Sequence, residues 1–334
     1  MKRALVMTVA VVLAWPALAG LPTNVAAAKN GGTAYPVKGL FNSDGAALID
    51  EVSGHPSQLE FTGWAAVVWD TPRTLDRIIV EMSYPNYVIP EYKIQIANAG
   101  VLNPDPLDDA HWTTVSGGHV VGVDKNSFPS FAFTPGWATA GVRFLAVDTV
   151  GPAGSNARLR EIWAFENYNN LALDADFSAP GWNPVAGTGF AASFNDECTT
   201  AQFKANTNGA SYVYATFTDL VTLDASCITG GGMAGEYLLD YNIEYWDYTL
   251  NGGAGDWAIA LTVRNSPEDP TRHADWRTFD VVATSDQWRL YCIASNGGGQ
   301  HCVSEIMLFA AAVPEPATMT LLALGGLALL RRKR

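Results

Sequence analysis

The chain has 334 residues with 33 acidic and 20 basic side chains, so its formal net charge at pH 7 is −13. Six of the basic residues belong to the two ends: Lys2, Arg3, Arg331, Arg332, Lys333 and Arg334. The part between them is therefore more acidic still and repels phosphate backbones, which argues against nucleic-acid binding. The charge favours solubility and low self-association, with binding of divalent cations as the alternative. The length suffices for two ordinary domains.

Residues 1–19 have the pattern of a secretory signal peptide. Met1-Lys2-Arg3 is basic, residues 4–13 are apolar, and Ala17-Leu18-Ala19 places small side chains where a signal peptidase reads them. We expect cleavage before Gly20 and export of the rest. The apolar run is shorter than a bilayer span, which disfavours an uncleaved anchor.

Between its ends the chain shows short alternating runs broken by Gly, Pro, Asn and Asp, and no helical apolar period that lasts three turns. This pattern predicts an all-β body of antiparallel sandwiches. A first unit is expected over residues 34–166, with a turn at 71–74. Its expected strands are 63–70, 75–82, 92–96, 111–115, 141–147 and 159–166.

The order of motifs in this unit carries a family resemblance. The residues concerned are Trp64, Pro72, Ile78, Tyr92-Lys93-Ile94, Trp112, Val142-Arg143 and Leu159-Arg160-Glu161-Ile162. They resemble the discoidin, or coagulation-factor C-type, branch of the galactose-binding-like superfamily. The resemblance implies a jelly-roll sandwich that binds carbohydrate and often holds a structural calcium ion. The opening D-G-N-x-x-T-x-W segment, near the family's ligand loops, has only Asp44-Gly45 and Trp64 as counterparts.

A second unit is expected over residues 171–310, joined to the first by a linker at 168–170. Its expected strands are 212–217, 221–224, 241–245, 275–279, 287–291 and 303–309. They repeat the order of the first unit, with 241–245 matching Tyr92-Lys93-Ile94 and 275–279 matching the Trp112 strand. The sequence therefore predicts a second, diverged discoidin-like sandwich. The alternative is an unrelated β domain.

Four cysteines all fall in the second unit: Cys198, Cys227, Cys292 and Cys302. An even count in an exported chain favours disulfides, and three pairings are possible. We favour Cys198–Cys227 with Cys292–Cys302, the latter closing a glycine-rich loop between two expected strands. Metal binding is the rival interpretation, but no C-x-x-C spacing supports it.

The sequence lacks the usual catalytic motifs. It has no G-x-S-x-G elbow, no H-E-x-x-H and no phosphate-binding G-x-x-x-x-G-K-[ST], and its five histidines are scattered. We therefore expect no enzyme activity. Because carboxylates are abundant, a hydrolase with a dispersed acid/base pair stays the alternative.

Two groups of loop residues are candidates for binding. Asp105, Asp108 and Asp109 cluster in one loop and could hold calcium, or be solvated turn residues. Tyr84, Tyr87 and Trp137 lie in turn-rich contexts, where exposed rings could stack on sugars, or the loops could be ordinary. We expect most other tryptophans to lie in the sandwich cores.

The last residues, 313–334, have three parts in fixed order. Pro314-Glu315-Pro316 precedes an apolar run at 317–330, and Arg331-Arg332-Lys333-Arg334 ends the chain. The run predicts a short hydrophobic transmembrane helix, and the terminal cations should hold its end in the cytoplasm. The order resembles the PEP-CTERM sorting tail of Gram-negative bacteria. That resemblance implies cutting by an exosortase-type enzyme, a transient inner-membrane anchor, and a final place at the cell surface or in the extracellular matrix, with a role in biofilm.

Together these features predict an exported, non-catalytic surface or matrix protein that binds exopolysaccharide or another glycan. Signal peptidase and an exosortase would be its processing partners. A structural surface protein that contacts other proteins is the second possibility, and a secreted carbohydrate-active hydrolase is the third.

Overall fold

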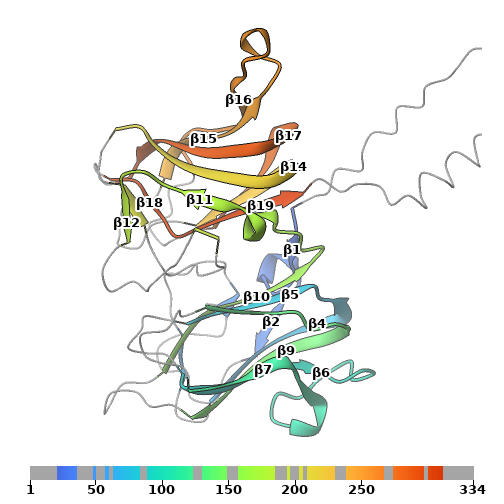
Figure 1. Cartoon of the computed structure of the whole chain (residues 1–334). Helices are drawn as coiled ribbons and strands as arrows, with labels where there is room; N and C mark the ends of the chain where they lie inside the picture. The colour runs from blue at the N-terminus through green and yellow to red at the C-terminus, as the bar shows by residue number, and fades with distance from the viewer. Residues whose placement is uncertain are drawn as a thin grey trace, which may run out of the picture.

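The structure is a computed structural model (Figure 1). It describes residues 21–35, 48–49, 57–59, 63–82, 89–122, 130–148, 157–184, 194–195, 203–205, 209–229, 238–266, 274–296 and 300–310. The expected signal peptide at 1–19 and the helix expected within 313–334 lie outside these ranges. Within them, helical structure is limited to short 3-10 segments, and none is long and apolar enough to cross a membrane.

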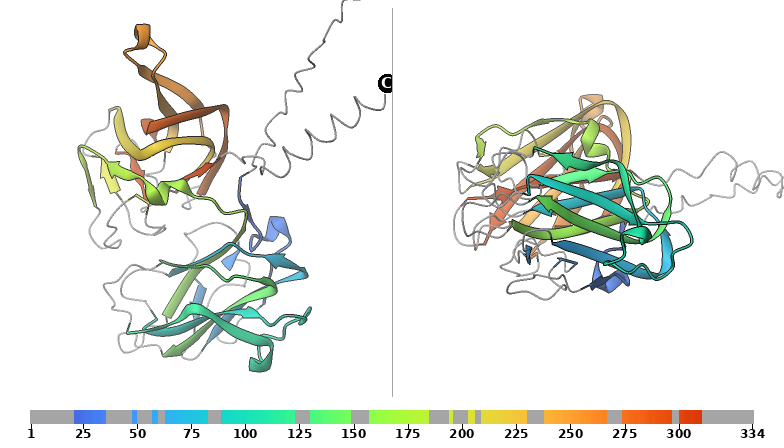
Figure 2. Two further views of the ribbon diagram at one scale, coloured as in Figure 1. Left: turned by 45° about the vertical axis from the view of Figure 1, so that its right-hand side comes forward. Right: turned by 90° about the horizontal axis from the view of Figure 1, so that it is seen from below.

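The first half of the chain is a sandwich of two antiparallel sheets (Figures 1 and 2). One sheet has the order β2 (Thr33–Tyr35), β4 (Trp64–Thr74), β9 (Ala138–Asp148), β6 (Glu91–Ala97) and β7 (Trp112–Val121). The other has the order β1 (Thr23–Asn24), β10 (Ala157–Glu166), β5 (Arg77–Met82) and β8 (Ser130–Phe133), with β3 (Ser57–Leu59) also paired to β10. The all-β prediction is confirmed for the described residues.

Alternation along the strands builds the core between these sheets. Val67 and Phe144 point inward from one sheet and Ile162 from the other, and all three are fully buried. Each such side chain contributes about 1.5–3 kcal/mol when it leaves water. Tyr92 stacks on Phe144 with ring centroids 5.0 Å apart. The first half therefore has a core of its own.

Two local expectations differ from the structure. The expected turn at 71–74 is wrong, because β4 runs to Thr74 with a shift of register between Val68 and Arg73. Pro72 lies within this irregularity, where a strand tolerates a residue without an N–H. The sandwich also includes residues before 34, since Thr23 and Asn24 pair with β10 and Val25 is fully buried.

The second half contains a six-stranded sheet and a three-stranded sheet, all antiparallel. The larger has the order β11 (Asp176–Ser178), β14 (Ser211–Thr229), β17 (Ala274–Ser295), β15 (Leu238–Asp247) and β16 (Asp256–Val263), with β19 (Glu305–Ala310) also paired to β14. The smaller has the order β12 (Trp182–Pro184), β13 (Phe203–Ala205) and β18 (Cys302–Val303). Trp288, Leu290 and Ile306 lie in the core of the second half.

The two halves share one strand order. The sequence β2-β4-β9-β6-β7 in the first half has the counterpart β11-β14-β17-β15-β16 in the second. The neighbours β10, β5 and β8 have counterparts in β19, the late part of β14 and the early part of β17, where Ala225 pairs with Thr278 and Phe309. The second half therefore differs chiefly in two long strands. β14 corresponds to both β4 and β5, and β17 corresponds to both β8 and β9.

This topology corrects one expected correspondence. Residues 275–279 pair with the end of β14 and so hold the place of β8, not that of the Trp112 strand. The counterpart of the Trp112 strand is β16, which pairs with β15 as β7 pairs with β6. Its sequence, with Ala258, Ile259, Ala260 and Leu261 in succession, lacks the alternation that marks a strand, because Ala260 is an extra residue between the partners of Ile243 and Glu244 and forms a bulge in β16 itself.

An aromatic cluster joins the halves. Trp276 of β17 stacks on Phe309 at 5.7 Å and contacts Phe165 at 5.8 Å and Trp163 at 6.1 Å, both on β10. Asn170 adds a polar contact, because its side-chain oxygen accepts hydrogen bonds from the backbone N–H groups of Ala172 (3.1 Å) and Leu308 (2.9 Å). The short linker therefore packs against the second half.

The structure shows no disulfide among the described cysteines. Cys227, Cys292 and Cys302 are buried thiols, and Cys198 lies outside the described residues. Cys292 belongs to the large sheet, opposite Ser211, whereas Cys302 belongs to the small sheet, opposite Lys204. Cys227 lies in a separate cluster with Met307 and Phe309. The three described cysteines are thus buried at three different places in the second half.

Candidate functional site

The outer face of the large sheet in the second half carries an unusual set of side chains. Alternation points Val213 of β14 and both Trp288 and Leu290 of β17 into the core, so their neighbours point outward. The outward residues are Tyr212 and Tyr214 on β14, Arg289 and Tyr291 on β17, Asn242, Glu244 and Trp246 on β15, and Trp257 on β16. We call this set the aromatic platform.

Register brings these residues into neighbouring rows. Tyr212 lies opposite Tyr291, Tyr214 lies opposite Arg289, and Trp246 lies opposite Trp257. The rings of Tyr212 and Tyr291 stack with centroids 4.8 Å apart and planes 15° from parallel. The carbon of the Arg289 guanidinium lies 4.2 Å from the Trp257 ring centroid and 4.7 Å from that of Tyr212. The platform is a continuous surface of rings around one cation.

A chain of hydrogen bonds runs across the same face. Arg264 donates to the side-chain oxygen of Asn242 (3.0 Å), and Asn242 donates to Glu244 (3.0 Å). Glu244 in turn accepts from Arg289 at 2.6 Å, and both members of that ion pair are largely buried, with side chains 6% and 16% exposed. These hydrogen bonds hold the polar side chains in one orientation without a ligand.

Polar groups edge the platform at its outer end. Gln287 donates to the hydroxyl of Tyr248 (3.1 Å), and that hydroxyl donates to Asp286 (2.7 Å). The hydrogen bond to Asp286 raises the pKa of Tyr248. Burial, and then the neighbouring Tyr291, raise the pKa of Tyr212. Both phenols therefore keep their protons at neutral pH and can donate as well as accept.

The first half contains the same arrangement in covered form. Gln95 and Arg143 hold the register positions of Glu244 and Arg289, and the Arg143 carbon lies 5.2 Å from the Trp112 ring centroid. Trp112 pairs with Ala97, two residues beyond Gln95, as Trp257 pairs with Trp246, two residues beyond Glu244. The arginine and its tryptophan are thus repeated at equivalent positions.

The loop between the last two strands of each sheet, β6–β7 in the first half and β15–β16 in the second, decides whether the arginine and the tryptophan are covered. In the first half, the β6–β7 loop folds over the face, where Arg143 donates to Pro106 (2.6 Å) and Asp109 (2.7 Å) and Trp112 donates to Asp105 (2.9 Å). Arg143 is 1% exposed and Trp112 is 5% exposed as a result. In the second half, the β15–β16 connection projects away as a hairpin, at the top of Figure 1. In the second half Trp257 is only partly buried, and the side chain of Arg289 keeps 16% of its surface exposed.

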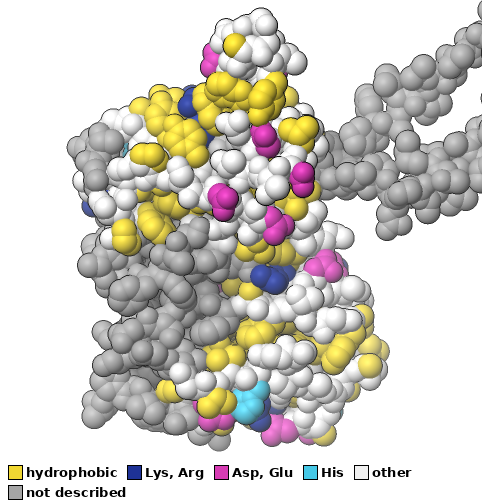
Figure 3. All heavy atoms as spheres, viewed as in Figure 1, with side chains coloured by type: hydrophobic (Ala, Val, Ile, Leu, Met, Phe, Trp, Pro, Cys, Tyr) yellow, Lys and Arg dark blue, Asp and Glu magenta, His cyan; other side chains and the backbone are white. Residues whose placement is uncertain are grey.

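The space-filling view shows side chains on one face of the second half. On the second half, hydrophobic side chains gather on the visible face beside Lys or Arg side chains (Figure 3). Partly exposed rings beside fixed donors and acceptors suit a ligand with alternating apolar and hydroxyl surface.

The residues predicted as binding sites lie elsewhere. Trp137 is 42% exposed, in the loop before β9, and is not part of the platform. Tyr84 and Tyr87 lie outside the described residues. Asp105 and Asp108 accept backbone hydrogen bonds from Leu107 and Ala110 within their own loop. Asp109 pairs with Arg143, and no described group of three or more His, Cys, Asp or Glu side chains could hold a metal ion.

The sequence contained a signal for the platform that strand assignment alone did not use. The pairs Tyr212 and Tyr214, and Arg289 and Tyr291, are each two residues apart and so share a face opposite the buried residues between them. The solvent-facing side of a strand rarely carries two aromatic residues, or an aromatic residue with an arginine. Such a pair therefore marks a candidate binding surface.

Comparisons with known proteins concern the C-terminal tail and the fold. Residues 312–334, outside the described ranges, match the PEP-CTERM protein-sorting motif and include Pro314-Glu315-Pro316 and Arg331-Arg332-Lys333-Arg334. The chain carries a PEP-CTERM sorting motif. The predicted sorting motif is confirmed, and it indicates an exported, cell-surface protein. No curated protein sequence matches the chain.

Among the solved structures similar to this chain are carbohydrate-binding domains. The paired CBM32-1 and CBM32-2 domains of Clostridium perfringens ZmpB, in complex with GalNAc, align over 84% of this chain and 89% of theirs, with 12% identity and a TM-score of 0.32. A fucolectin from striped bass serum aligns over 88% and 100%, with 12% identity and a TM-score of 0.32. The family 32 module of C. perfringens NanJ, in complex with galactose, aligns over 42% and 97%, with 13% identity and a TM-score of 0.34. Scores this low do not transfer a ligand to this chain.

Proposed function

We propose that this chain is an exported, non-catalytic surface protein that binds extended polysaccharide through the aromatic platform of its second half. The observation that carries the proposal is the open pair of Trp257 and Arg289, whose counterparts in the first half are covered. Aromatic faces offer apolar contact to the CH groups of a sugar ring. The fixed row of Asn242, Glu244 and Arg289 offers acceptors and donors to its hydroxyls.

We further propose that the halves, 34–166 and 171–310, are diverged copies of one galactose-binding-like sandwich. The shared strand order and the repeated arginine and tryptophan support a duplication. The family assignment rests on the sequence resemblance that closes on Leu159-Arg160-Glu161-Ile162. The copies would differ in use, with the first covered and the second open.

The tail completes the proposal. An exosortase-type enzyme would cut near Pro314-Glu315-Pro316 after transient anchoring in the inner membrane of a Gram-negative cell, which leaves the sandwiches at the surface or in the biofilm matrix. Intact-mass analysis of the protein from its host would test this. A mass that includes Arg331-Arg332-Lys333-Arg334 would refute cutting.

Binding can be tested with a glycan array and with pull-down on insoluble polysaccharides, using the full chain in mild detergent. We expect Trp257→Ala to weaken binding about tenfold, because loss of one stacked ring removes roughly 1–2 kcal/mol. The matched control is Trp137→Ala, an exposed tryptophan outside the platform, which should bind within about twofold of the parent.

The second candidate is contact with another protein, because exposed aromatic residues beside an arginine also form hot spots of protein interfaces. Silent glycan arrays together with a surface protein captured by the parent, and not by Trp257→Ala, would favour that function. Equal polysaccharide binding by the parent and Trp257→Ala would refute the platform as the site.

A further inference from the structure

A buried carboxylate on β14 lacks the hydrogen-bond donors that its burial demands. Asp224 is 3% exposed, and neither of its side-chain oxygens has a hydrogen-bond partner within the described residues. Burial also raises the pKa of Asp224. Buried carboxylates in folded proteins are normally paired or accept several hydrogen bonds. Because both oxygens are covered, a ligand from solvent does not reach them, and the chain itself is the nearest source of a donor.

The first half has an aspartate at the same position, and there the structure shows the donor. Asp76 comes directly before the β5 residue that pairs with Phe165 of β10. Asp224 comes directly before the β14 residue that pairs with Phe309 of β19. The carboxylate of Asp76 accepts a hydrogen bond from the backbone N–H of Tyr168 (3.2 Å), three residues after Phe165. In the first half this aspartate therefore holds the chain that leaves the last strand of the sandwich.

The same spacing in the second half puts Ala312 at the position of Tyr168. Ala312 follows Phe309 by three residues, as Tyr168 follows Phe165. It lies outside the described ranges, two residues before Pro314-Glu315-Pro316. The buried carboxylate of the second half thus occupies the place at which the chain continues into the sorting motif.

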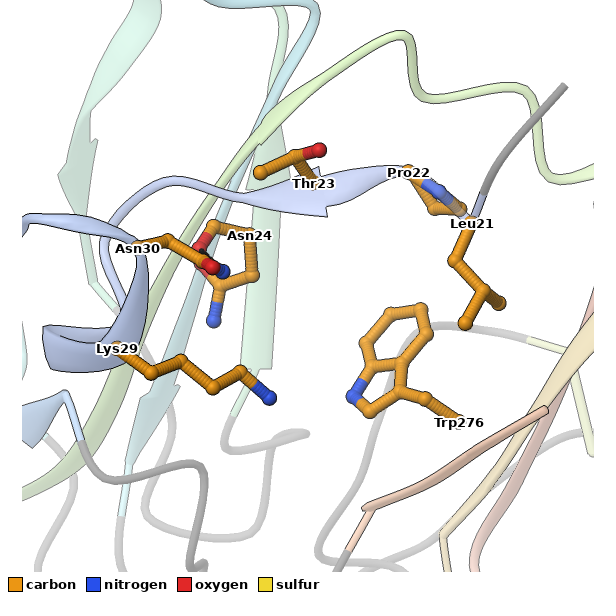
Figure 4. A pocket seen from close by; sticks show the side chains of 7 residues that line it. All are labelled: Leu21, Pro22, Thr23, Asn24, Lys29, Asn30 and Trp276. Carbon is orange, nitrogen blue, oxygen red and sulfur yellow. Dashed lines mark hydrogen bonds between the residues drawn. The ribbon is translucent and has the colours of Figure 1, made fainter.

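The joint between the halves fixes the point at which this segment leaves the body. Phe309 stacks on Trp276 with ring centroids 5.7 Å apart, and Ala310 pairs with Leu223, next to the buried aspartate. Leu21 lines a small cleft together with Trp276 (Figure 4) and packs against the apolar cluster that contains Phe309. The chain beyond Ala310 therefore starts beside the buried carboxylate.

We propose that the carboxylate of Asp224 accepts the backbone N–H of Ala312 and so docks residues 311–313 onto the second half. A hydrogen bond to a charged acceptor is stronger than one between neutral groups, and here it also satisfies a buried carboxylate. Pro314-Glu315-Pro316 then begins two residues from a fixed point on the body. An exosortase-type enzyme therefore meets the motif at a set distance from the folded domain. The proposal depends on the sorting motif and not on glycan binding by the aromatic platform.

Hydrogen exchange of the full chain in mild detergent, followed by mass spectrometry of peptic fragments, tests this contact. A fragment that spans residues 309–316 reports the few amides between β19 and the end of the motif, because its two prolines have no N–H. In the parent we expect one of these amides to exchange about tenfold more slowly than in an unstructured peptide. Asp224→Leu should remove this protection, whereas Asp224→Asn, which keeps a side-chain oxygen as acceptor, should retain most of it.

Asp76→Leu is the matched control in the first half. It removes the acceptor of a hydrogen bond that the structure shows, so the Tyr168 amide should exchange faster in a fragment over residues 166–170. The fragment over residues 309–316 should keep its slow amide in this variant. Trp257→Ala should leave both fragments unchanged, so failure of this contact and failure of the platform are distinguishable.

Two results would overturn the proposal. Exchange of residues 309–316 at the unstructured rate in the parent would mean that Asp224 holds no amide of this segment. Protection that survives Asp224→Leu would mean that another contact holds it. Where leucine disturbs β19, seen as faster exchange over residues 305–310, Asp224→Ala removes the same acceptor with a smaller side chain and gives the same comparison.

Discussion

The ion pair at the centre of the platform makes a quantitative prediction for Arg289→Met. Methionine keeps much of the apolar stem and removes the cation that pairs with Glu244 at 2.6 Å. The Glu244 side chain is 6% exposed, so the variant leaves a carboxylate that is buried and uncompensated. Breaking a buried pair in this way costs about 3–5 kcal/mol.

The structure places the expected cost near the lower end of that range. Arg289 is 16% exposed in its side chain, and Asn242 still donates to Glu244 in the variant, so solvent and this amide soften the loss. Loss of the cation–π contacts with Trp257 and Tyr212 adds about 0.5–1 kcal/mol. We therefore expect the free energy of unfolding of the second half to fall by about 3–4 kcal/mol.

Urea unfolding followed by near-ultraviolet circular dichroism measures this loss. With a slope of about 2 kcal/mol per molar urea, the midpoint of the second half should fall by about 1.5–2 M. Glu244→Leu in the same chain should recover most of the loss, because an apolar pair replaces the lone carboxylate. Arg264→Met is the control, since Arg264 is exposed and bonds to neutral groups, and it should cost under about 1 kcal/mol.

Two results would refute this reasoning. A loss under about 1 kcal/mol in Arg289→Met would mean that solvent compensates Glu244 and that the pair is not buried in effect. A double variant no more stable than the single one would mean that the loss comes from packing of the methionine and not from an unpaired charge.

Other predictions concern particular buried groups. Burial lowers the pKa of His301, whose ring nitrogen lies 2.7 Å from the Ser211 hydroxyl. The neutral ring is therefore favoured in the folded state. The stability it contributes above pH 6.5 should decline as the pH falls below that value toward the lower folded pKa, and His301→Asn should remove this slope in urea titrations. Burial also raises the pKa of the Cys292 thiol, so iodoacetamide should label Cys292 and Cys302 only after unfolding. Dithiothreitol should leave the urea midpoints unchanged.

Strand positions were predictable because burial imposes a period of two. Residues 92–96 and 241–245 alternate cleanly, and both form strands with a neighbour on each side, as β6 and β15. β16 escaped prediction because it carries a bulge at Ala260, which interrupts its own alternation. The cysteines show a different limit, since their even number says nothing about which core each thiol joins.

The site could not be predicted because its exposure depends on a loop. Arg143 and Trp112 in the first half and Arg289 and Trp257 in the second have the same spacing in the sheet. Only the hydrogen bonds from Arg143 to Pro106 and Asp109 show that the first copy is covered. A sequence pattern places residues on a face, whereas tertiary contacts decide whether water or a ligand reaches that face.

The carboxylate that balances the arginine charge differs between the two copies. In the covered copy, Asp109 of the loop balances the charge of Arg143, and the cross-strand neighbour is the neutral Gln95. In the open copy no loop carboxylate lies over Arg289 in the described residues, and the cross-strand neighbour is Glu244. Gln95→Glu should therefore draw Arg143 away from Asp109 and loosen the β6–β7 loop. Faster hydrogen exchange in residues 98–111, with β16 unchanged, would support this compensation, and unchanged exchange in the loop would contradict it.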